Sequence, residues 1–179
     1  MIWSAIDIEV KNITSATGIP SFQAVVSEFV AESFSRSHHG IGTHLDAEVA
    51  VTRAISEVAQ SRVVDLQAMR EDITAPGQPV EKALYHVRRS NRANPESWAI
   101  KPSAHSVRLQ DVASHPSTDV MADVQLLLQR LRARGLDQAI VVDLSALGVP
   151  ATVVRVIVPG IESWTWRGAS RRCRTPAPP

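Results

Sequence analysis

The sequence predicts an α+β fold in which a mixed, mostly antiparallel sheet is flanked by two main helices. Helical periodicity runs without a proline or glycine through residues 46–69 and again through 119–134. Short runs rich in β-branched residues lie at 139–142 and 152–158. The connection between these two runs is short, which favours an antiparallel pair over a parallel crossover.

The composition is that of a globular protein with one domain. The 179 residues are 44% hydrophobic and 21% charged, and the net charge is +1. So small a charge gives no electrostatic attraction to nucleic acid or membrane, and no apolar run is long enough to span a bilayer. The single cysteine, Cys173, excludes an intrachain disulfide. Because the N-terminus also lacks the pattern of a signal peptide, we expect a cytoplasmic protein.

The first forty residues contain one clear strand. Residues 1–11 alternate in a way that fits either a strand or a short helix, and the polar stretch 12–17 predicts a turn. After a break at 18–20, Phe22, Ala24 and Val26 alternate as in a half-buried strand. Serines disfavour a long helix in the following residues, so we expect a loop up to His39 and a glycine-broken turn at 40–42.

Asp46 is a good N-cap for the first helix, and Glu48 lies in the first turn, where the helix dipole favours a negative charge. The residues expected to form the buried stripe are Val51, Ala54, Ile55 and Val58. Near Arg70 the helix ends in a charged cluster.

Arg53, Glu57 and Gln60 follow the same helical spacing on a different face. One interpretation is a solvated face whose Arg–Glu pair contributes about 0.2–0.5 kcal/mol. The other is a ligand-facing stripe, because carboxylates suit Mg²⁺ and the planar arginine fork suits phosphate. In that case the glycines at 40–42 would let the backbone approach the ligand closely. The spacing alone leaves both interpretations open.

The three histidines before this helix do not predict a metal site. His38 and His39 are neighbours, so their side chains point to different sides of any regular element, and no cysteine lies near them. We expect solvated or loop-capping roles for both, and we expect His44 to shape the turn at the start of the helix.

The rest of the chain contains one more strong helix signal. Residues 74–117 are poorly patterned, and their basic patch at 88–92 lacks interleaved aromatics, which indicates surface charge. The helix at 119–134 has an apolar stripe and ends at Gly135, a natural stop. The stripe consists of Val124, Leu127, Leu128 and Leu131. Residues 163–179 form a tail rich in arginine and proline, and we expect it to be disordered.

The strand at 139–142 is of the fully buried type. Arg155 interrupts the apolar run of the strand at 152–158, where a charge blunts a sheet edge against pairing with another chain.

Two separated segments of the chain resemble the YcaO family. The first spans 40–62, and the residues that match the family's late signature are Gly42, His44, Asp46, Glu48, Ala50, Arg53, Ala54, Glu57, Gln60 and Arg62. The second spans 141–162, and its matching residues are Asp143, Gly148, Pro150, Val153, Arg155, Val158, Pro159, Gly160 and Glu162. The segments follow one another in the family's order, and the resemblance covers most of the chain from about Gly18 onward.

The resemblance implies an enzyme that uses ATP and Mg²⁺ to phosphorylate a backbone amide oxygen of a precursor peptide or protein. A nucleophile then attacks the activated carbonyl. A Cys, Ser or Thr side chain of the substrate gives an azoline, and sulfide gives a thioamide, in the modification of ribosomal peptides. In this resemblance Arg53 faces phosphate, Glu57 helps to hold Mg²⁺, and Gln60 and Arg62 support the nucleotide. No catalytic residue is assigned.

The family's earlier nucleotide-binding segments have no counterpart upstream of Asp46. We therefore expect residues 1–162 to be the C-terminal part of a YcaO domain, inactive alone and completed by an N-terminal half or partner protein. Apolar surface left uncovered would favour a homodimer or poor solubility. Two alternatives stay open. One is a non-catalytic YcaO-derived module that binds a peptide or partner protein, and the other is a sulfur-transfer (methylthiotransferase) accessory protein.

Overall fold

The computed structural model describes residues 6–31, 34–68 and 98–161. The expectations for Arg70 and its neighbours, the basic patch at 88–92, Cys173 and the tail at 163–179 lie outside these residues. The chain divides into two compact units, Met1–Thr118 and Asp119–Pro179. Antiparallel sheets and two α-helices make up the described part, so the predicted α+β class is confirmed.

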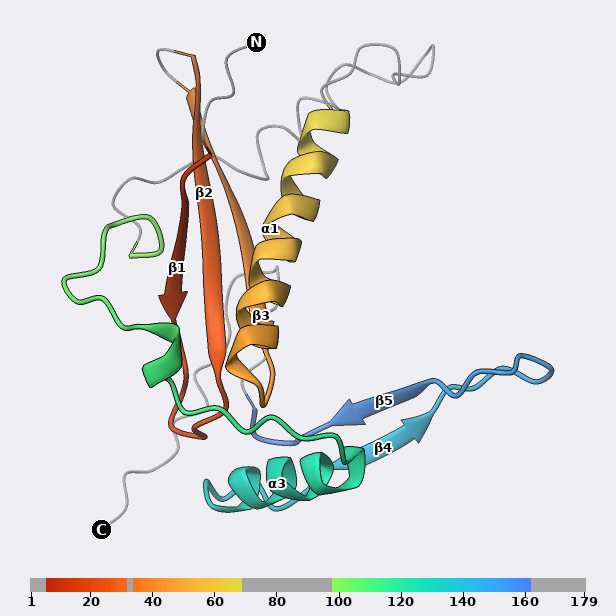
Figure 1. Ribbon diagram of the computed structural model, residues 1–179. Helices are drawn as coiled ribbons and strands as arrows, with labels where there is room; N and C mark the ends of the chain where they lie inside the picture. Colours follow the sequence, from red (N-terminus) through yellow and green to blue (C-terminus); the bar gives the residue numbers. More distant parts are fainter. Residues whose placement is uncertain (1–5, 32–33, 69–97, 162–179) are drawn as a thin grey trace. The chain divides into compact units, whose positions relative to one another are not determined.

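The first unit is built on a three-stranded antiparallel sheet with the order β1-β2-β3 (Figure 1). The strands are β1 (Ile8–Asn12), β2 (Ser21–Ala31) and β3 (Phe34–Thr43). A polar turn with Gly18 at φ 72° joins β1 to β2. The alternation of Phe22, Ala24 and Val26 predicted this strand correctly, and all three side chains are buried.

The expected loop before His39 and the glycine-broken turn at 40–42 are wrong, because both lie in β3. This strand pairs with β2 in a long hairpin, from Ser21 opposite Thr43 to Phe29 opposite Ser35. Serine, histidine and glycine are poor strand formers by propensity. Pairing with the apolar β2 and packing against the following helix outweigh that preference.

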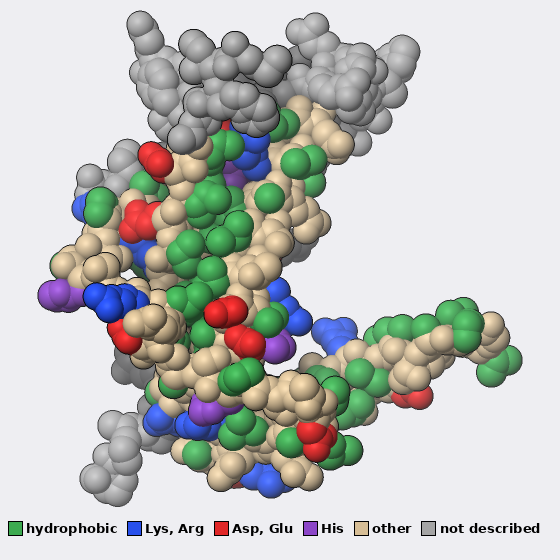
Figure 2. Space-filling view, viewed as in Figure 1, with side chains coloured by type: hydrophobic (Ala, Val, Ile, Leu, Met, Phe, Trp, Pro, Cys, Tyr) green, Lys and Arg blue, Asp and Glu red, His purple; other side chains and the backbone are tan. Residues whose placement is uncertain are grey.

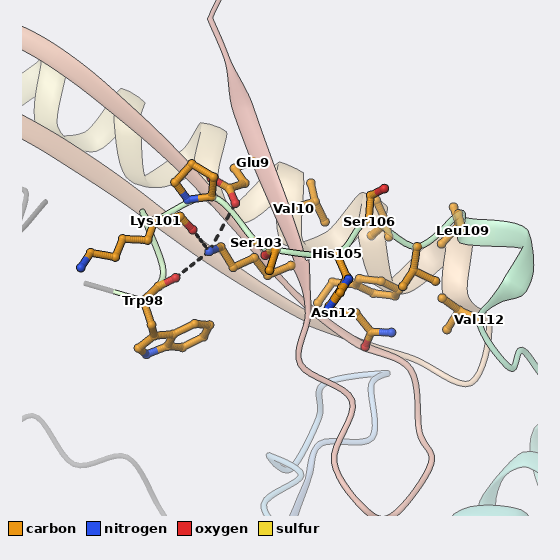
Figure 3. A pocket seen from close by; sticks show the side chains of 16 residues that line it. Glu9, Val10, Asn12, Trp98, Lys101, Ser103, His105, Ser106, Leu109 and Val112 are labelled. Atoms are coloured by element: carbon orange, nitrogen blue, oxygen red, sulfur yellow. Dashed lines mark hydrogen bonds and ion pairs between the residues drawn. The ribbon is translucent and has the colours of Figure 1, made fainter. Parts of the chain in front are cut away.

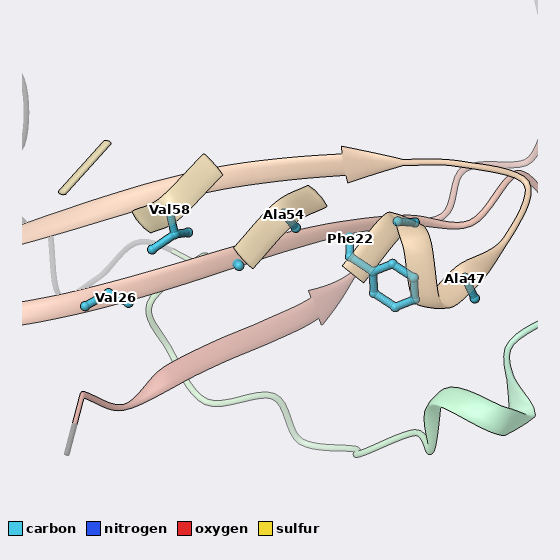
Figure 4. Close-up of a cluster of buried hydrophobic side chains, with 7 residues drawn as sticks. Phe22, Val26, Ala47, Ala54 and Val58 are labelled. Carbon is cyan, nitrogen blue, oxygen red and sulfur yellow. The ribbon is translucent and has the colours of Figure 1, made fainter. Parts of the chain in front are cut away.

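Helix α1 (Ala47–Ala68) packs on β3 and β2. Its start is as predicted, since the side chain of Asp46 accepts a hydrogen bond from the Glu48 N–H at 2.8 Å. The helical stripe is confirmed and extends further toward the N-terminus than expected. Figure 4 shows the core that results. Its buried members are Phe22, Ala24, Val26, Ala47, Ala50, Ala54 and Val58, and Val51 and Ile55 pack against them half-buried.

Gly40 and Gly42 bring β3 against α1, where a ligand-approaching turn had been expected. A Cβ atom at Gly42 would lie 1.9 Å from the carbonyl oxygen of Ala50, and one at Gly40 would lie 2.2 Å from that of Ala54. No other residue fits at that separation. These glycines therefore allow the close approach of two backbones, with small alanines on the facing side of the helix.

Residues 98–118 belong to the first unit and contact both the start of α1 and the outer side of β1. The Ser114 hydroxyl accepts from the Ala47 N–H at 3.0 Å, and the His115 N–H donates to the carbonyl of Leu45 at 2.8 Å. The short 3-10 turn η2 (Leu109–Asp111) lies in this segment, and Val112 packs against the core.

The second unit contains α3 (Val120–Arg132) and the hairpin of β4 (Ile140–Asp143) and β5 (Val154–Ile157). Asp119 caps α3 by accepting from the Met121 and Ala122 N–H groups. The predicted stop is confirmed, because Gly135 adopts φ 74° and its N–H donates to the carbonyl of Arg132. The two strands form the predicted antiparallel pair.

The expectation that residues 139–142 form a buried strand is wrong. Every residue of β4 and β5 is exposed, with Val141 at 62% and Val156 at 58%, and no residue of α3 is buried. A two-stranded hairpin has too little surface to bury side chains on both of its faces. Among the described residues, no helix is long and apolar enough to cross a membrane.

Candidate functional site

Helix α1 carries polar side chains on two different sides. Arg53 and Glu57 lie on the side toward the outer edge of β3. There the Ile41 N–H donates to Glu57 Oε2 at 2.6 Å, and Arg53 Nη1 donates to the carbonyl of Thr43 at 3.4 Å. Gln60 follows on the same side by helical spacing and is exposed. The structure therefore brings the three residues of the predicted stripe to one face.

The position of Arg53 and Glu57 follows from the hydrogen-bond pattern of the sheet. The Ile13 N–H donates to the Ser21 carbonyl, and hydrogen-bonded pairs alternate along an antiparallel ladder, so Ser21 and Gln23 direct their backbone groups to β1. Their partners on β3, Thr43 and Ile41, must then direct theirs away from β2. Arg53 and Glu57 thus cover the open edge of the sheet.

This face has hydrogen-bonding groups that are available to a ligand. Oε1 of Glu57 and the remaining guanidinium nitrogens of Arg53 make no hydrogen bond within the described part of the chain. A guanidinium with free donors matches two phosphate oxygens, and a carboxylate oxygen suits Mg²⁺. The residue types therefore fit contact with a phosphate group and supply one metal ligand.

The metal itself needs ligands that this face does not supply. Within residues 6–31, 34–68 and 98–161, no group of three or more His, Cys, Asp or Glu side chains is placed to hold an ion. Mg²⁺ bound to a nucleotide is commonly held by one or two carboxylates together with phosphate oxygens and water. Glu57 fits such a site as one ligand among several.

Arg62 does not lie with Arg53 and Glu57. It follows Arg53 by about two and a half helical turns, so its side chain is on the opposite side of α1. Its Nε donates to Glu28 Oε1 on β2 at 2.6 Å. Glu28 also lies 3.6 Å from His38 on β3, and His38 lies 3.5 Å from Asp65 on α1. These four side chains form a second polar group, which we call the His38 cluster.

Three members of the His38 cluster were not predicted from the sequence as site residues, namely Glu28, His38 and Asp65. The expectation of a solvated or loop-capping His38 is wrong, since only 1% of its side chain is exposed. A signal was present. Arg62 and Asp65 continue the buried stripe of α1 at four and seven residues after Val58. His38 shares one face with Gly40 and Gly42 once residues 34–43 are taken as a strand.

The other two histidines have local partners. His39 contacts the Gln23 amide at 3.3 Å and the Ser37 hydroxyl at 3.0 Å. Burial of the ring, and then the charge of His38, lower the pKa of His39 from its ordinary value of 6.5. His44 Nδ1 accepts from the Asp46 N–H at 3.0 Å, so it shapes the turn as predicted.

In the second unit, Arg155 lies opposite Val142 in the β4–β5 ladder. Asp143 ends β4 and accepts from the Ser145 N–H at 2.8 Å. Hydrogen bonds from Ser145, first its side chain and then its backbone, lower the pKa of Asp143. This arrangement stabilises a turn.

Comparison with known proteins gives a consistent result. The family model described as YcaO cyclodehydratase, ATP- and Mg²⁺-binding, matches residues 3–162. An uncharacterized protein of Methanothermobacter thermautotrophicus is 35% identical over 161 residues, which are 89% of this chain and 40% of that protein. An uncharacterized protein encoded in the tfuA 3′ region of Rhizobium leguminosarum bv. trifolii is 30% identical over 156 residues, 84% of this chain and 36% of that protein.

Two solved structures share this fold. The heterocyclase TruD matches 92% of this chain with a TM-score of 0.63 and 26% identity. A heterocyclase in complex with substrate and cofactor matches 87% with a TM-score of 0.64 and 23% identity, and that likeness concerns the fold alone. This chain spans 36–40% of the two relatives above and about a fifth of each solved chain.

Proposed function

This chain belongs to the YcaO family, and we propose that it supplies part of a site for ATP-dependent activation of a peptide amide. The observation that carries the proposal is the exposed pair on α1. Arg53 and Glu57 lie on one face at the edge of β3, with donors and an acceptor oxygen to spare. In this proposal Arg53 binds phosphate and Glu57 contributes one Mg²⁺ ligand.

The rigid seating of α1 is what makes this face suitable for phosphate. Close contact at Gly40 and Gly42 seats the helix on β3, and backbone groups of Thr43 and Ile41 form hydrogen bonds with the side chains of Arg53 and Glu57. Charged groups held in place before the ligand arrives stabilise charge on a transferring phosphoryl group without reorganisation. Gln60 adjoins this face, and Arg62 acts from the opposite side of α1 by holding the helix against Glu28.

ATP with Mg²⁺ supplies the phosphoryl group that activates the amide oxygen of the peptide. Azoline and thioamide products differ in the nucleophile that attacks the activated amide, and the phosphate-binding role proposed for Arg53 and Glu57 is common to both. In this proposal phosphate oxygens and water complete the coordination of Mg²⁺ together with any further carboxylate that another segment supplies. The share of the relatives that this chain spans is consistent with a division of the site between segments.

The proposal is tested by titrating ATP and Mg²⁺ into the purified chain by calorimetry. The informative variants are Arg53→Ala and Glu57→Gln, because the glutamine oxygen still accepts from the Ile41 N–H while the charge is removed. Gln67→Ala, an exposed position on the same helix, is the matched control. We expect binding that both variants weaken at least tenfold and the control does not.

Binding that is equal in all four proteins would overturn the assignment of Arg53 and Glu57. A wild-type chain that binds no ATP, alone or with added N-terminal segments of a longer relative, would favour the alternative of a non-catalytic peptide- or partner-binding module.

A further inference from the structure

The two outer edges of the first sheet, on β3 and on β1, differ in how their backbone groups are covered. Glu57 and Arg53 cover the outer edge of β3. On β1, the ladder with β2 directs the backbone groups of Glu9 and Lys11 inward. The N–H and C=O groups of Ile8, Val10 and Asn12 must therefore point outward. No backbone hydrogen bond joins β1 to any part of the segment 98–112 that the structure describes.

A cavity of about 930 Å³ lies along this open edge, and we call it the β1 groove (Figure 3). Its apolar lining includes Val10, Phe22, Val51, Trp98, Leu109 and Val112. Ile8 and Val10 lie opposite Val26 and Ala24 in the ladder, so their side chains are on the face that α1 covers elsewhere. Because α1 packs on β2 and β3, Ile8 stays 42% exposed and Val10 38% exposed. Figure 2 shows hydrophobic side chains gathered along this side of α1.

The segment 98–112 forms the outer wall of the groove, and it is anchored at both ends. Lys11 Nζ donates to the carbonyl of Trp98 at 2.6 Å and to that of Lys101, pairs with Glu9 at 3.3 Å, and lies 6.0 Å from the centre of the Trp98 ring. At the other end, Val112 packs on the core and Ser114 binds the start of α1. The wall is thus held beside β1 without pairing to it.

We propose that the β1 groove binds an extended peptide, which adds as a fourth strand to the outer edge of β1. Such a peptide has backbone groups and side chains that match the unpaired strand edge and the apolar lining of the groove. Its backbone pairs with the outward N–H and C=O groups of Ile8, Val10 and Asn12, and alternate side chains contact Val10 and Phe22. The site lies on the edge of the sheet opposite Arg53 and Glu57, and binding there is independent of nucleotide.

The anchored wall argues for a peptide over a second copy of the chain. Pairing two β1 strands edge to edge would bring a whole sheet up to β1, and the segment 98–112 lies in that path. A single extended strand needs only about 5 Å of lateral space beside its neighbour. The groove is therefore suited to a strand with no sheet behind it.

The test measures fluorescence anisotropy of a fluorescein-labelled peptide of alternating valine and threonine, about six residues long to match an ordinary strand. No ATP is present, so this result is separate from the nucleotide titration. The matched probe is the same peptide N-methylated at every internal residue, which keeps the side chains and removes the N–H donors. We expect the full chain to bind the first probe at least tenfold more tightly than the second.

Val10→Pro is the sharpest protein variant, because it removes one outward N–H without removing a hydrogen bond to β2. We expect it to weaken binding at least fivefold more than its control Val10→Ala does, because Val10→Ala loses the same side-chain contact but keeps the outward N–H. Urea unfolding checks that Val10→Pro folds. If it does not fold, Lys11→Met is the variant that tests the proposal. It removes the hydrogen bonds from Lys11 to the segment 98–112, and we expect it to weaken peptide binding at least threefold.

Equal binding of the two peptides, or no binding by the wild-type chain, would refute the proposal. A wild-type dimer in sedimentation that Val10→Pro converts to monomer would also refute it, because the occupant would then be a second copy. If the wild-type chain binds the peptide but not ATP, the peptide site is supported and the proposed function is refuted.

Discussion

At the scale of single residues, Gly42 has the closest backbone contact of the glycines that the structure describes in β3. A methyl group there would lie 1.9 Å from the carbonyl oxygen of Ala50, an atom of helix backbone that cannot turn aside. We predict that Gly42→Ala lowers the free energy of unfolding by about 3 kcal/mol or more. Urea denaturation measures it.

The control for Gly42→Ala is Ser56→Ala on the exposed side of α1, expected within about 0.5 kcal/mol of wild type. A Gly42→Ala variant as stable as this control would show that β3 and α1 do not pack as closely as described.

His39 gives a prediction about pH. Its pKa is lower in the folded chain than its ordinary value of 6.5, because of burial and the charge of His38. The unfolded state therefore binds more protons as the pH falls below 6.5, and stability decreases in that direction. We predict that His39→Gln, which can still bond to Gln23 and Ser37, reduces this decrease.

The measurement is the urea midpoint of wild type and His39→Gln at a series of pH values on both sides of 6.5. Identical slopes in the two proteins would assign the pH dependence to other groups.

At the scale of elements, the His38 cluster joins the far end of α1 to the β2–β3 hairpin. The Glu28–Arg62 pair is less than a third exposed at either partner, so solvent screens it only partly. We predict a coupling of about 1–2 kcal/mol between Glu28→Gln and Arg62→Met in a double-mutant cycle. Additive effects on urea stability would mean that the two side chains act separately.

The elements also show what the sequence could predict. Strong local signals located both helices, the Asp46 cap, the Gly135 stop and the β4–β5 pair. β3 was missed because its residues have low strand propensity, and because its glycines serve a contact with a helix that comes later in the chain. Local patterns contain no information on such a contact.

In the candidate site, too, local helical spacing was predictable from the sequence and contacts with β3 were not. Helical spacing placed Arg53, Glu57 and Gln60 on one face. It could not show that Arg53 and Glu57 also cover a sheet edge, since that depends on the register of β3. Arg62 was grouped with them by resemblance, although helix geometry alone places it on the opposite side of α1.

At the scale of the whole molecule, the second unit has many exposed apolar side chains. Val141 and Val156 face each other on one side of the β4–β5 hairpin, at 62% and 58% exposure. Exposed apolar patches and unpaired strand edges favour association. We predict that the isolated chain self-associates, and that the double variant Val141→Lys, Val156→Glu shifts it toward monomer.

Sedimentation velocity over a range of concentrations tests this, with Val63→Lys on the exposed side of α1 as a control that changes charge in the first unit. A wild-type chain that stays monomeric at all concentrations would show that these side chains are not an association surface.

The bond between the Ile41 N–H and Glu57 also provides a built-in reporter. Amide hydrogens exchange with deuterated solvent when their acceptor leaves, and this one depends on a single side-chain oxygen. If Mg²⁺ and nucleotide draw the Glu57 carboxylate away from β3, deuterium uptake at Ile41 speeds up while uptake in the β2–β3 ladder does not. A ligand that contacts Arg53 alone, or that contacts Glu57 only through Oε1, leaves the Ile41 rate unchanged. Faster uptake at Ile41 therefore reports specifically that the Glu57 carboxylate has moved away from β3.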